Sequence, residues 1–253
     1  MRAQDRLLEA LLPIVRSAGE EIMAIYRTDF EVRGKQDASP VTEADERAEK
    51  MIVAGLDRLT PEVPIVAEEA VAAGHVPDVS ARFWLVDPLD GTKEFIKRNG
   101  EFTVNIALIE NGVPVLGVVL TPALERLYGG TLEHGAFVED AAGRRRIACR
   151  AEPPEGLTVV ASRSHGDAEA LDRFLAGRKV ASLTSAGSSL KFCLVAEGKA
   201  DLYPRLGRTM EWDTAAGHAV LSAAGGRVTT LGGEPLRYAK AGFENPHFVA
   251  SGV

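Results

Sequence analysis

The sequence predicts a layered protein that combines helices with sheets, an α/β protein of the α+β type. Residues 103–109 and 113–120 are rich in branched side chains and flank Asn111-Gly112, a pair typical of a β-hairpin because both residues tolerate positive φ. Beyond residue 156, short apolar runs alternate with helical patterns, which favours βα units. The 253 residues suffice for one large domain or two packed halves.

The first half opens with helices and continues into strands. Apolar residues at helical spacing predict one helix over residues 4–26 and a second that opens at Pro40. A buried strand over residues 83–87 is expected to end there, because Pro88 cannot donate to a sheet ladder. The other strands expected in this mostly antiparallel sheet cover residues 65–67, 103–109, 113–120, 127–128 and 136–138.

The second half is expected to begin near residues 152–156, where two prolines and a glycine interrupt the pattern. We therefore expect an N-terminal half over residues 1–150, with most metal ligands, and a C-terminal half over residues 151–253. Its expected strands cover residues 157–161, 180–183, 202–203 and 228–229, and its expected helices cover residues 167–175, 190–196 and 214–224. This alternation predicts a layered arrangement.

Composition and charge narrow the class of protein. The hydrophobic content of 45% and charged content of 26% are ordinary for a globular protein, and the net charge of −7 argues against a nucleic-acid polymer as partner. Cys149 and Cys193 are far apart and are expected to be free thiols in a reducing cytoplasm. No signal peptide is recognisable, and no apolar run approaches the roughly 20 residues that cross a bilayer. We expect a cytoplasmic protein without an integral membrane segment.

The acidic stretch at the end of the strand over residues 83–87 carries the clearest chemical signal. Asp87 and Asp90 are close enough in sequence for both carboxylates to reach one point. Behind them, Gly91-Thr92-Lys93 can start a helix, whose first backbone N–H groups attract an anion. Carboxylates that hold cations beside an anion-binding helix start indicate a metal-dependent phosphoester site.

Further acids occur near the ends of predicted elements. Glu68 follows a predicted strand, as Asp87 does, so two strands can bring carboxylates to the same sheet edge. Helix capping is an alternative for two others, because Asp213 precedes a helix and Asp45 forms a Thr-x-x-Asp capping box with Thr42. Carboxylates about 4 Å apart repel by a few kcal/mol per pair even at an effective dielectric of about 20, so a cluster requires cations. An all-oxygen ligand set favours Mg²⁺ or Mn²⁺ over zinc.

Three motifs stand out in combination: Glu68-Glu69, Asp87-Pro88-Leu89-Asp90-Gly91-Thr92 and Trp212-Asp213-Thr214-Ala215-Ala216. Together they resemble the signatures of the lithium-sensitive, magnesium-dependent phosphatases, the inositol monophosphatase superfamily that also includes fructose-1,6-bisphosphatase. One branch of this superfamily, the bacterial 3′(2′),5′-bisphosphate nucleotidases, is further resembled by residues 93–105, 162–165, 187–198 and 202–205. The resemblance runs through nearly the whole chain.

The resemblance implies a layered αβαβα sandwich of the sugar-phosphatase type, with two or three bound Mg²⁺ ions. It assigns one ion to Glu68, Asp87 and the backbone carbonyl of Leu89. Asp87, Asp90 and Asp213 would hold the second. Mn²⁺ is an alternative metal, and Li⁺ is expected to inhibit.

The same resemblance assigns the other site residues. Asp45 and the Thr92 hydroxyl would orient the attacking water, and Glu68 would contact the surroundings of that water. Glu69 would have a supporting, structural role. The backbone N–H groups of Gly91 and Thr92 would bind phosphate oxygens. A second phosphate suits a lysine charge and an arginine fork, and the full set of implied substrate-binding residues is Gly91, Thr92, His165, Ser188, Lys191 and Arg205. The structural alternatives are a loop position for His165 and a solvated helix position for Lys191.

The activity implied by the resemblance is Mg²⁺-dependent conversion of adenosine 3′,5′-bisphosphate to AMP and phosphate in sulfur assimilation, with 3′-phosphoadenylyl sulfate as a second substrate. An inositol-phosphate phosphatase is the nearest alternative, and a non-catalytic Mg²⁺- or nucleotide-binding regulator is an alternative of another class. A monomer is favoured over a dimer. A peripheral position on the cytoplasmic face of the inner membrane is the alternative to a freely cytoplasmic protein.

Overall fold

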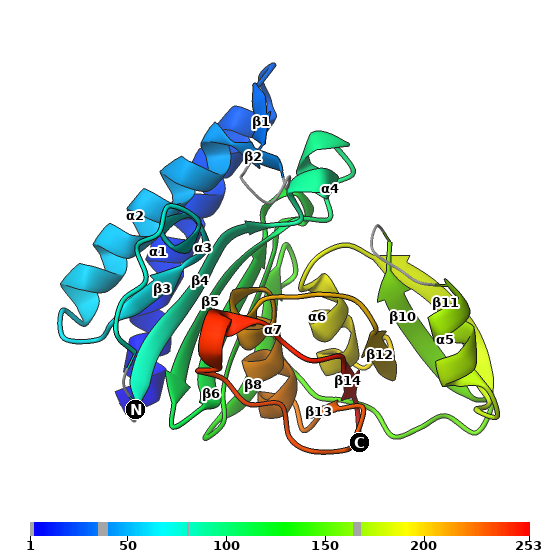
Figure 1. Ribbon diagram of the computed structural model, residues 1–253. Helices are drawn as coiled ribbons and strands as arrows, with labels where there is room; N and C mark the ends of the chain where they lie inside the picture. The colour runs from blue at the N-terminus through cyan, green and yellow to red at the C-terminus, as the bar shows by residue number, and fades with distance from the viewer. Residues whose placement is uncertain (1–2, 35–39, 80, 164–167) are drawn as a thin grey trace.

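The computed structural model describes residues 3–34, 40–79, 81–163 and 168–253. Helices and sheets alternate in layers across the molecule, in the order helix, sheet, helix, sheet, helix (Figure 1). The layers confirm the expected αβαβα sandwich.

The larger sheet holds seven strands in the order β3-β4-β5-β6-β7-β8-β9. β3 and β4 run parallel, and the other neighbouring pairs are antiparallel, as predicted for this half. Asn111 and Gly112 join β5 to β6 with φ of 51° and 73°, which confirms the hairpin. The strands are β3 (Ile65–Ala67), β4 (Arg82–Asp90), β5 (Thr103–Glu110), β6 (Val113–Thr121), β7 (Arg126–Thr131), β8 (Gly135–Asp140) and β9 (Gly143–Ile147).

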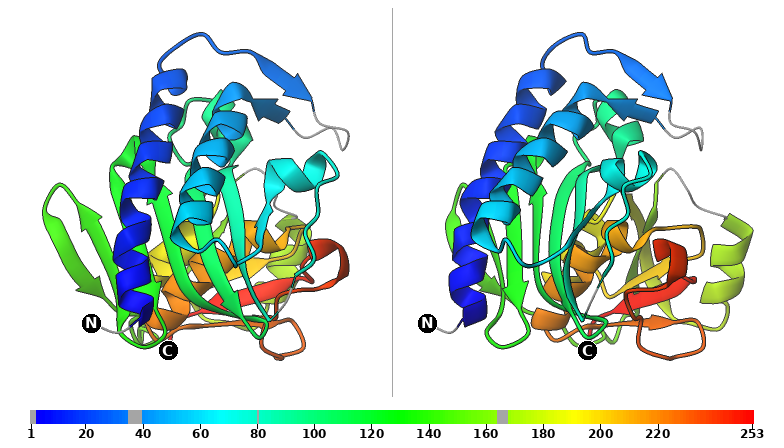
Figure 2. Two further views of the ribbon diagram at one scale, coloured as in Figure 1. Left: turned by 90° about the vertical axis from the view of Figure 1, so that its left-hand side faces the viewer. Right: turned by 60° about the vertical axis from the view of Figure 1, so that its left-hand side comes forward.

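Two long helices, α1 (Ala3–Tyr26) and α2 (Glu43–Leu59), cover the outer face of this sheet (Figure 2). Their buried positions recur at helical spacing, so each helix turns one apolar stripe to the strands. The expectation that β4 ends at Pro88 is wrong. Pairing with β5 breaks after Asp87 and resumes at Asp90, because Pro88 has no N–H for the ladder and the backbone bulges around it.

The smaller sheet has the order β11-β10-β12-β14-β13 and mixes parallel with antiparallel pairs. Its outer face carries helix α5, and helices α6 and α7 lie between the two sheets (Figure 1). The strands are β10 (Leu157–Ser162), β11 (Val180–Ala186), β12 (Leu202–Arg205), β13 (Arg227–Thr230) and β14 (Phe248–Ser251). The helices are α5 (Ala168–Leu175), α6 (Leu190–Ala196) and α7 (Glu211–Ala223).

Glycines let α7 lie close to both of its neighbours. A Cβ atom on Gly117 of β6 would lie 2.4 Å from the carbonyl oxygen of Ala216 on α7. A Cβ atom on Gly217 of α7 would lie 2.6 Å from the Phe192 ring on α6. Because these two positions have no side chain, α7 can pack closely against the larger sheet and against α6. The first turn of α7 then lies at the sheet edge where β4 ends.

Several short elements complete the described chain: β1 (Val32–Gly34), β2 (Pro40–Thr42), α3 (Glu68–Ala72), α4 (Thr92–Ile96) and 3₁₀ turns at Pro122–Leu124 and Ala241–Phe243. Residues 148–156 connect the two sheets, and the division into halves at residue 150 stays a prediction. Cys149 and Cys193 are free thiols, as expected. Among the helices that the structure describes, none is both long enough and apolar enough to span a bilayer.

Candidate active site

A cleft opens where β3 and β4 end side by side. Because the two strands are parallel and Ala67 pairs with Val86, Glu68 and Asp87 emerge at the same sheet edge. The cleft has a volume of about 1210 Å³. It is lined by every residue predicted to hold metal: Glu68, Asp87, Leu89, Asp90 and Asp213.

Backbone contacts orient the two acids of β4. Asp87 is 1% exposed, and its Oδ1 accepts a hydrogen bond from the Leu89 N–H at 3.0 Å. Asp90 accepts a hydrogen bond from the Ser189 N–H at 2.7 Å and a longer one from Asn105 Nδ2 at 3.5 Å. The bulge of β4 thus places both carboxylates in the cleft.

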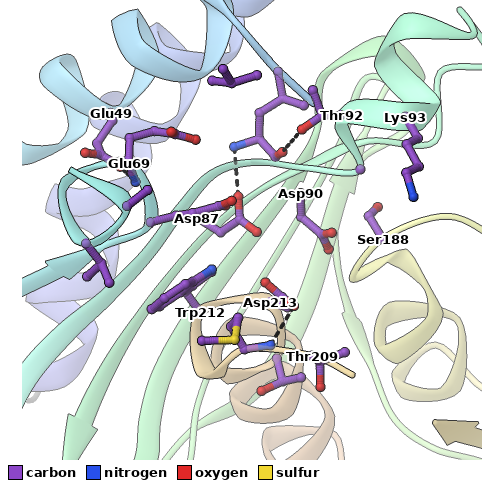
Figure 3. Close-up of a pocket in the computed structure, with 18 of the residues that line it drawn as sticks. Glu49, Glu69, Asp87, Asp90, Thr92, Lys93, Ser188, Thr209, Trp212 and Asp213 are labelled. Atoms are coloured by element: carbon purple, nitrogen blue, oxygen red, sulfur yellow. Dashed lines mark hydrogen bonds between the residues drawn. The ribbon is translucent and has the colours of Figure 1, made fainter. Parts of the chain in front are cut away.

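Asp213 reaches the same space from α7. Asp213 is the third residue of α7 and does not precede the helix as expected, but its Oδ2 accepts a hydrogen bond from the N–H of the N-cap residue Met210 at 2.8 Å and so helps to cap the helix. The same carboxylate also points toward Asp87 and Asp90 (Figure 3). The Ser189 hydroxyl donates to the Asp213 backbone carbonyl at 2.5 Å, so one serine contacts two of the acids. Capping and a place in the cleft are therefore compatible.

Burial and mutual repulsion oppose ionisation of these acids. Burial raises the pKa of Asp87 well above its usual value, and the neighbouring acids, Glu68 first, raise it further. Burial also raises the pKa of Asp213, with Asp90 and Glu68 adding repulsion. The pKa of Asp90 is raised by burial to about 6, although Lys191 acts in the opposite direction. A cation beside these acids would restore their ionised form, because an opposite charge nearby favours it.

The donor set fits Mg²⁺. Its members are carboxylate and carbonyl oxygens, which hard divalent cations prefer. Across residues 3–34, 40–79, 81–163 and 168–253, no three His, Cys, Asp or Glu side chains stand as a preformed cage for an ion. Mg²⁺ does not need such a cage, since it keeps several waters and binds through one or two carboxylates together with substrate phosphates. An open acidic cleft therefore suits this metal.

Thr92 links the cleft to Asp45. The Thr92 hydroxyl lies 3.2 Å from Oδ1 of Asp45 and 3.4 Å from the Leu89 carbonyl. The other oxygen of Asp45 accepts hydrogen bonds from the Thr42 N–H and hydroxyl at 2.8 and 2.7 Å, which confirms the predicted capping box. Asp45 is 1% exposed and lies behind Thr92. Gly91, with φ of 92°, is the N-cap residue of α4 and has no side chain with which to cap this helix start.

Ser188, Lys191 and Arg205 line the opposite side of the cleft, so the structure brings together the predicted substrate residues that it describes. Lys191 is 3% exposed and donates to the Ser188 carbonyl at 2.6 Å, so the solvated alternative for Lys191 is wrong. Burial lowers the pKa of Lys191 to about 8, against the effect of Asp90. His165 lies outside the described residues.

Other residues that shape this side lie in segments that carry the resemblance, but the sequence assigned them no role. Glu101 accepts a hydrogen bond from the Gly187 N–H at 2.9 Å and pairs with Arg163 at 2.8 Å, which fixes the turn before α6. The ring of Tyr203 lies 5.2 Å from the Lys191 ammonium. Each contact joins segments that are distant in sequence, so no local pattern signals it.

The layered αβαβα fold, with acids gathered at one sheet edge beside the start of a helix, is typical of metal-dependent phosphatases of the sugar-phosphatase type. The model of the inositol monophosphatase family matches residues 3–249, and the chain belongs to this family. Members of the family generally use Mg²⁺.

Curated relatives and solved structures agree with this assignment. The chain is 51% identical over 249 residues to the 3′(2′),5′-bisphosphate nucleotidase CysQ of Escherichia coli K12, with 97% of this chain and 99% of the relative covered. It is 52% identical over 246 residues to the protein of the same name from Salmonella typhimurium LT2, with 96% and 98% covered. The crystal structure of CysQ from Bacteroides thetaiotaomicron is similar with a TM-score of 0.82 and 41% identity, covering 99% of this chain and 98% of that one.

Proposed function

We propose that this chain is a Mg²⁺-dependent 3′(2′),5′-bisphosphate nucleotidase that converts adenosine 3′,5′-bisphosphate to AMP and phosphate in sulfur assimilation. One observation carries the proposal: a single cleft joins the acids of β4 and α7 to the cationic side chains of Lys191 and Arg205. It therefore offers a side for metal and a side for a second phosphate. Full-length relatives that bear this activity in their names support it. 3′-Phosphoadenylyl sulfate carries the same 3′-phosphate and is the proposed second substrate.

In this proposal the acids hold two or three Mg²⁺ ions. Glu68, Asp87 and the Leu89 carbonyl would hold one, and Asp87, Asp90 and Asp213 would hold another. Bound there, Mg²⁺ would neutralise charge on the phosphate and on the attacking and leaving oxygens. The protein's part is to keep these carboxylates oriented and largely shielded from solvent, through the backbone contacts of Leu89 and Met210.

Asp45 and Thr92 would orient the attacking water. The contacts from Thr42 fix one oxygen of Asp45 and leave Oδ1 as the acceptor for the Thr92 proton. A threonine hydroxyl whose proton is engaged in this way presents its lone pairs to another donor, such as water. A carboxylate behind it then favours removal of a proton as the water attacks.

The substrate's two phosphates would be read on opposite sides of the cleft. The N–H groups of Gly91 and Thr92 at the start of α4 would bind the phosphate that is removed, because helix starts attract anions. Lys191 and Arg205 would bind the retained phosphate through charge-assisted hydrogen bonds, and Ser188 and His165 would contact the rest of the nucleotide. A substrate with one phosphate leaves this second side without its anion.

The test is release of phosphate from adenosine 3′,5′-bisphosphate with Mg²⁺, with the nucleotide product identified by chromatography. We expect AMP as the product, loss of activity with chelator, and inhibition by Li⁺. Asp87→Asn should reduce turnover by more than the roughly 10–100-fold typical of residues that only support metal ligands. Nucleotide binding without phosphate release would instead indicate a non-catalytic regulator, and adenosine 3′-phosphate as product would reverse the assigned positions of the phosphates.

We further propose that the partner is a small-molecule nucleotide and that the active protein is a monomer in the cytoplasm. Size-exclusion chromatography with light scattering measures the mass directly, and 27.0 kDa is the value expected for one chain. Sedimentation with membrane vesicles would support the peripheral alternative.

A further inference from the structure

Glu49 joins the long helix α2 to the short helix α3. It is 7% exposed and lies one turn after Asp45. Its two carboxylate oxygens accept hydrogen bonds from the backbone N–H groups of Glu69 at 2.7 Å and Ala70 at 2.8 Å. Figure 3 shows Glu49 beside Glu69 at the edge of the cleft. Glu49 therefore caps the start of α3 from a different helix.

Helix α3 is held in place by the packing of Ala70 and Val71 against the two hydrophobic cores and by its contact with Glu49. It spans five residues, Glu68–Ala72, whereas isolated helices shorter than about 12–15 residues are marginal in water. None of its residues is buried, and Ala67 at its start makes no side-chain capping bond. A carboxylate at a helix start also interacts favourably with the positive end of the helix dipole. The two hydrogen bonds from Glu49 thus fix the first turn of α3.

We propose that Glu49 is a positioning residue for the metal site. Glu68 is the first residue of α3 and immediately precedes the N–H group that Glu49 holds. The preceding residue, Ala67, is fixed by its pairing with β4, and the direction of the Glu68 carboxylate beside Asp87 then depends on the first turn of α3. The inference rests on the proposed function, in which Glu68 and Asp87 hold Mg²⁺. Glu49 acts through the backbone of α3 and does not itself touch substrate.

The position of Glu49 on α2 gives the contact a second consequence. Asp45 and Glu49 are four residues apart, so they lie on the same face of this helix. Asp45 holds the Thr92 hydroxyl, and Glu49 holds the segment that begins with Glu68. One helix therefore sets the position of a metal ligand relative to the residues that orient the water.

The test compares Glu49→Gln with wild type in two measurements that do not depend on turnover. In Gln, one acceptor oxygen becomes an NH₂ group that faces a backbone N–H and cannot accept its hydrogen bond. We expect faster hydrogen exchange at the amides of residues 69 and 70 in metal-free protein. We also expect the Mg²⁺ concentration at half of the thermal stabilisation to rise about 10–100-fold, the usual effect of losing a group that supports a metal ligand. Glu49→Asp, which keeps the charge on a shorter side chain, should give exchange rates and a Mg²⁺ midpoint between those of wild type and Glu49→Gln.

Glu46→Gln is the matched control. The substitution removes a negative charge from the same helix at the same cleft. Glu46, however, pairs with the Arg33 side chain at 3.0 Å and not with the backbone of α3. We expect wild-type exchange and a wild-type Mg²⁺ midpoint. The inference is overturned if Glu49→Gln leaves the Mg²⁺ midpoint unchanged, or if Glu46→Gln shifts it equally. A wild-type protein with no thermal response to Mg²⁺ would contradict the proposed function, and the exchange rates would still decide whether Glu49 holds α3.

Discussion

At the scale of single residues, one carboxylate can accept a hydrogen bond from the backbone and also contribute to the cleft. Asp45 caps α2 through Thr42 and also faces the Thr92 hydroxyl. Asp213 accepts the Met210 N–H while it points at Asp87 (Figure 3). In the sequence, capping was an alternative to metal binding for Asp213 and to a role in the active site for Asp45. Because a carboxylate has two oxygens, each acid can meet both demands.

Asp45→Asn tests the proposed orientation of the water. Asparagine keeps one oxygen for the cap at Thr42 but replaces the acceptor for the Thr92 proton by a donor. We expect turnover to fall by about 10²–10⁴-fold, the usual contribution of a positioned acid or base. The melting temperature should stay close to that of wild type. Stopped assays at saturating Mg²⁺ measure the loss, and wild-type turnover would remove Asp45 from the mechanism.

His218 gives a pH dependence that is independent of the cleft. Burial lowers the pKa of this histidine to about 3, and its Nδ1 contacts the Tyr238 hydroxyl at 3.0 Å. Between an unfolded pKa of about 6.5 and the folded value, the unfolded chain binds a proton that the folded protein does not. The free energy of unfolding should therefore fall as pH drops below about 6.5, by up to about 1.4 kcal/mol per pH unit from this residue.

The measurement is denaturant unfolding from pH 7 to pH 4 for wild type, His218→Gln and His75→Gln. In His218→Gln the free energy of unfolding should fall less steeply with pH, because the contribution of this histidine is lost. The curves of wild type and His218→Gln should therefore converge at low pH. His75 is exposed, and its replacement serves as the control for the loss of a histidine as such. Parallel curves for wild type and His218→Gln would contradict the account.

At the scale of elements, the sequence predicted those that carry a strong local pattern. The helix over residues 190–196 has the predicted bounds, and the hairpin at Asn111-Gly112 is confirmed because positive φ restricts the residue types there. The extension of β4 past Pro88 was not predictable, since its pairing with β5 resumes through Thr103. β14 and α3 were also missed. Both are short, and each depends on partners far away in the sequence.

Gly117→Ala tests the close packing of α7 on β6. The new Cβ would lie 2.4 Å from the Ala216 carbonyl oxygen and 2.7 Å from the Ala219 Cβ, so the helix must move. We expect a loss of about 1–3 kcal/mol in the free energy of unfolding, as for other overpacked positions. Gly232→Ala, where the nearest atom lies 3.6 Å away, is the control and should stay within about 0.5 kcal/mol of wild type. Equal stability of both variants would contradict the packing argument.

At the scale of the whole molecule, the cleft depends on how the two sheets are joined. The acids of β4 belong to the larger sheet, Arg205 lies on β12 of the smaller sheet, and Ser188 and Lys191 lie in the turn after β11 and on α6. The motifs identified these residues individually. That β3 and β4 bring Glu68 and Asp87 to the same sheet edge was expected, because each acid follows a predicted strand. The placement of α7 between the sheets, and the links through Ser189, could not be predicted because they depend on packing between distant segments.

Removal of Mg²⁺ should destabilise the whole molecule. The acids of the cleft repel one another, and an ion that binds only the folded protein stabilises it by mass action. At a Mg²⁺ concentration about 100 times the dissociation constant, the gain is about 2.7 kcal/mol, or several degrees in melting temperature for a chain of this size. Thermal unfolding with chelator and with added Mg²⁺ measures the difference. Identical melting temperatures would mean that the acids do not form a metal site.

The central claim is that this cleft reads a second phosphate as well as hydrolysing the first. The most direct test compares kcat/KM for adenosine 3′,5′-bisphosphate and inositol 1-phosphate at saturating Mg²⁺. We predict a preference of at least about 100-fold for the nucleotide, because two hydrogen bonds to a charged phosphate contribute roughly 1.5–3 kcal/mol each. Equal values, or a preference for the inositol ester, would contradict the assignment of Lys191 and Arg205 and with it the proposed substrate.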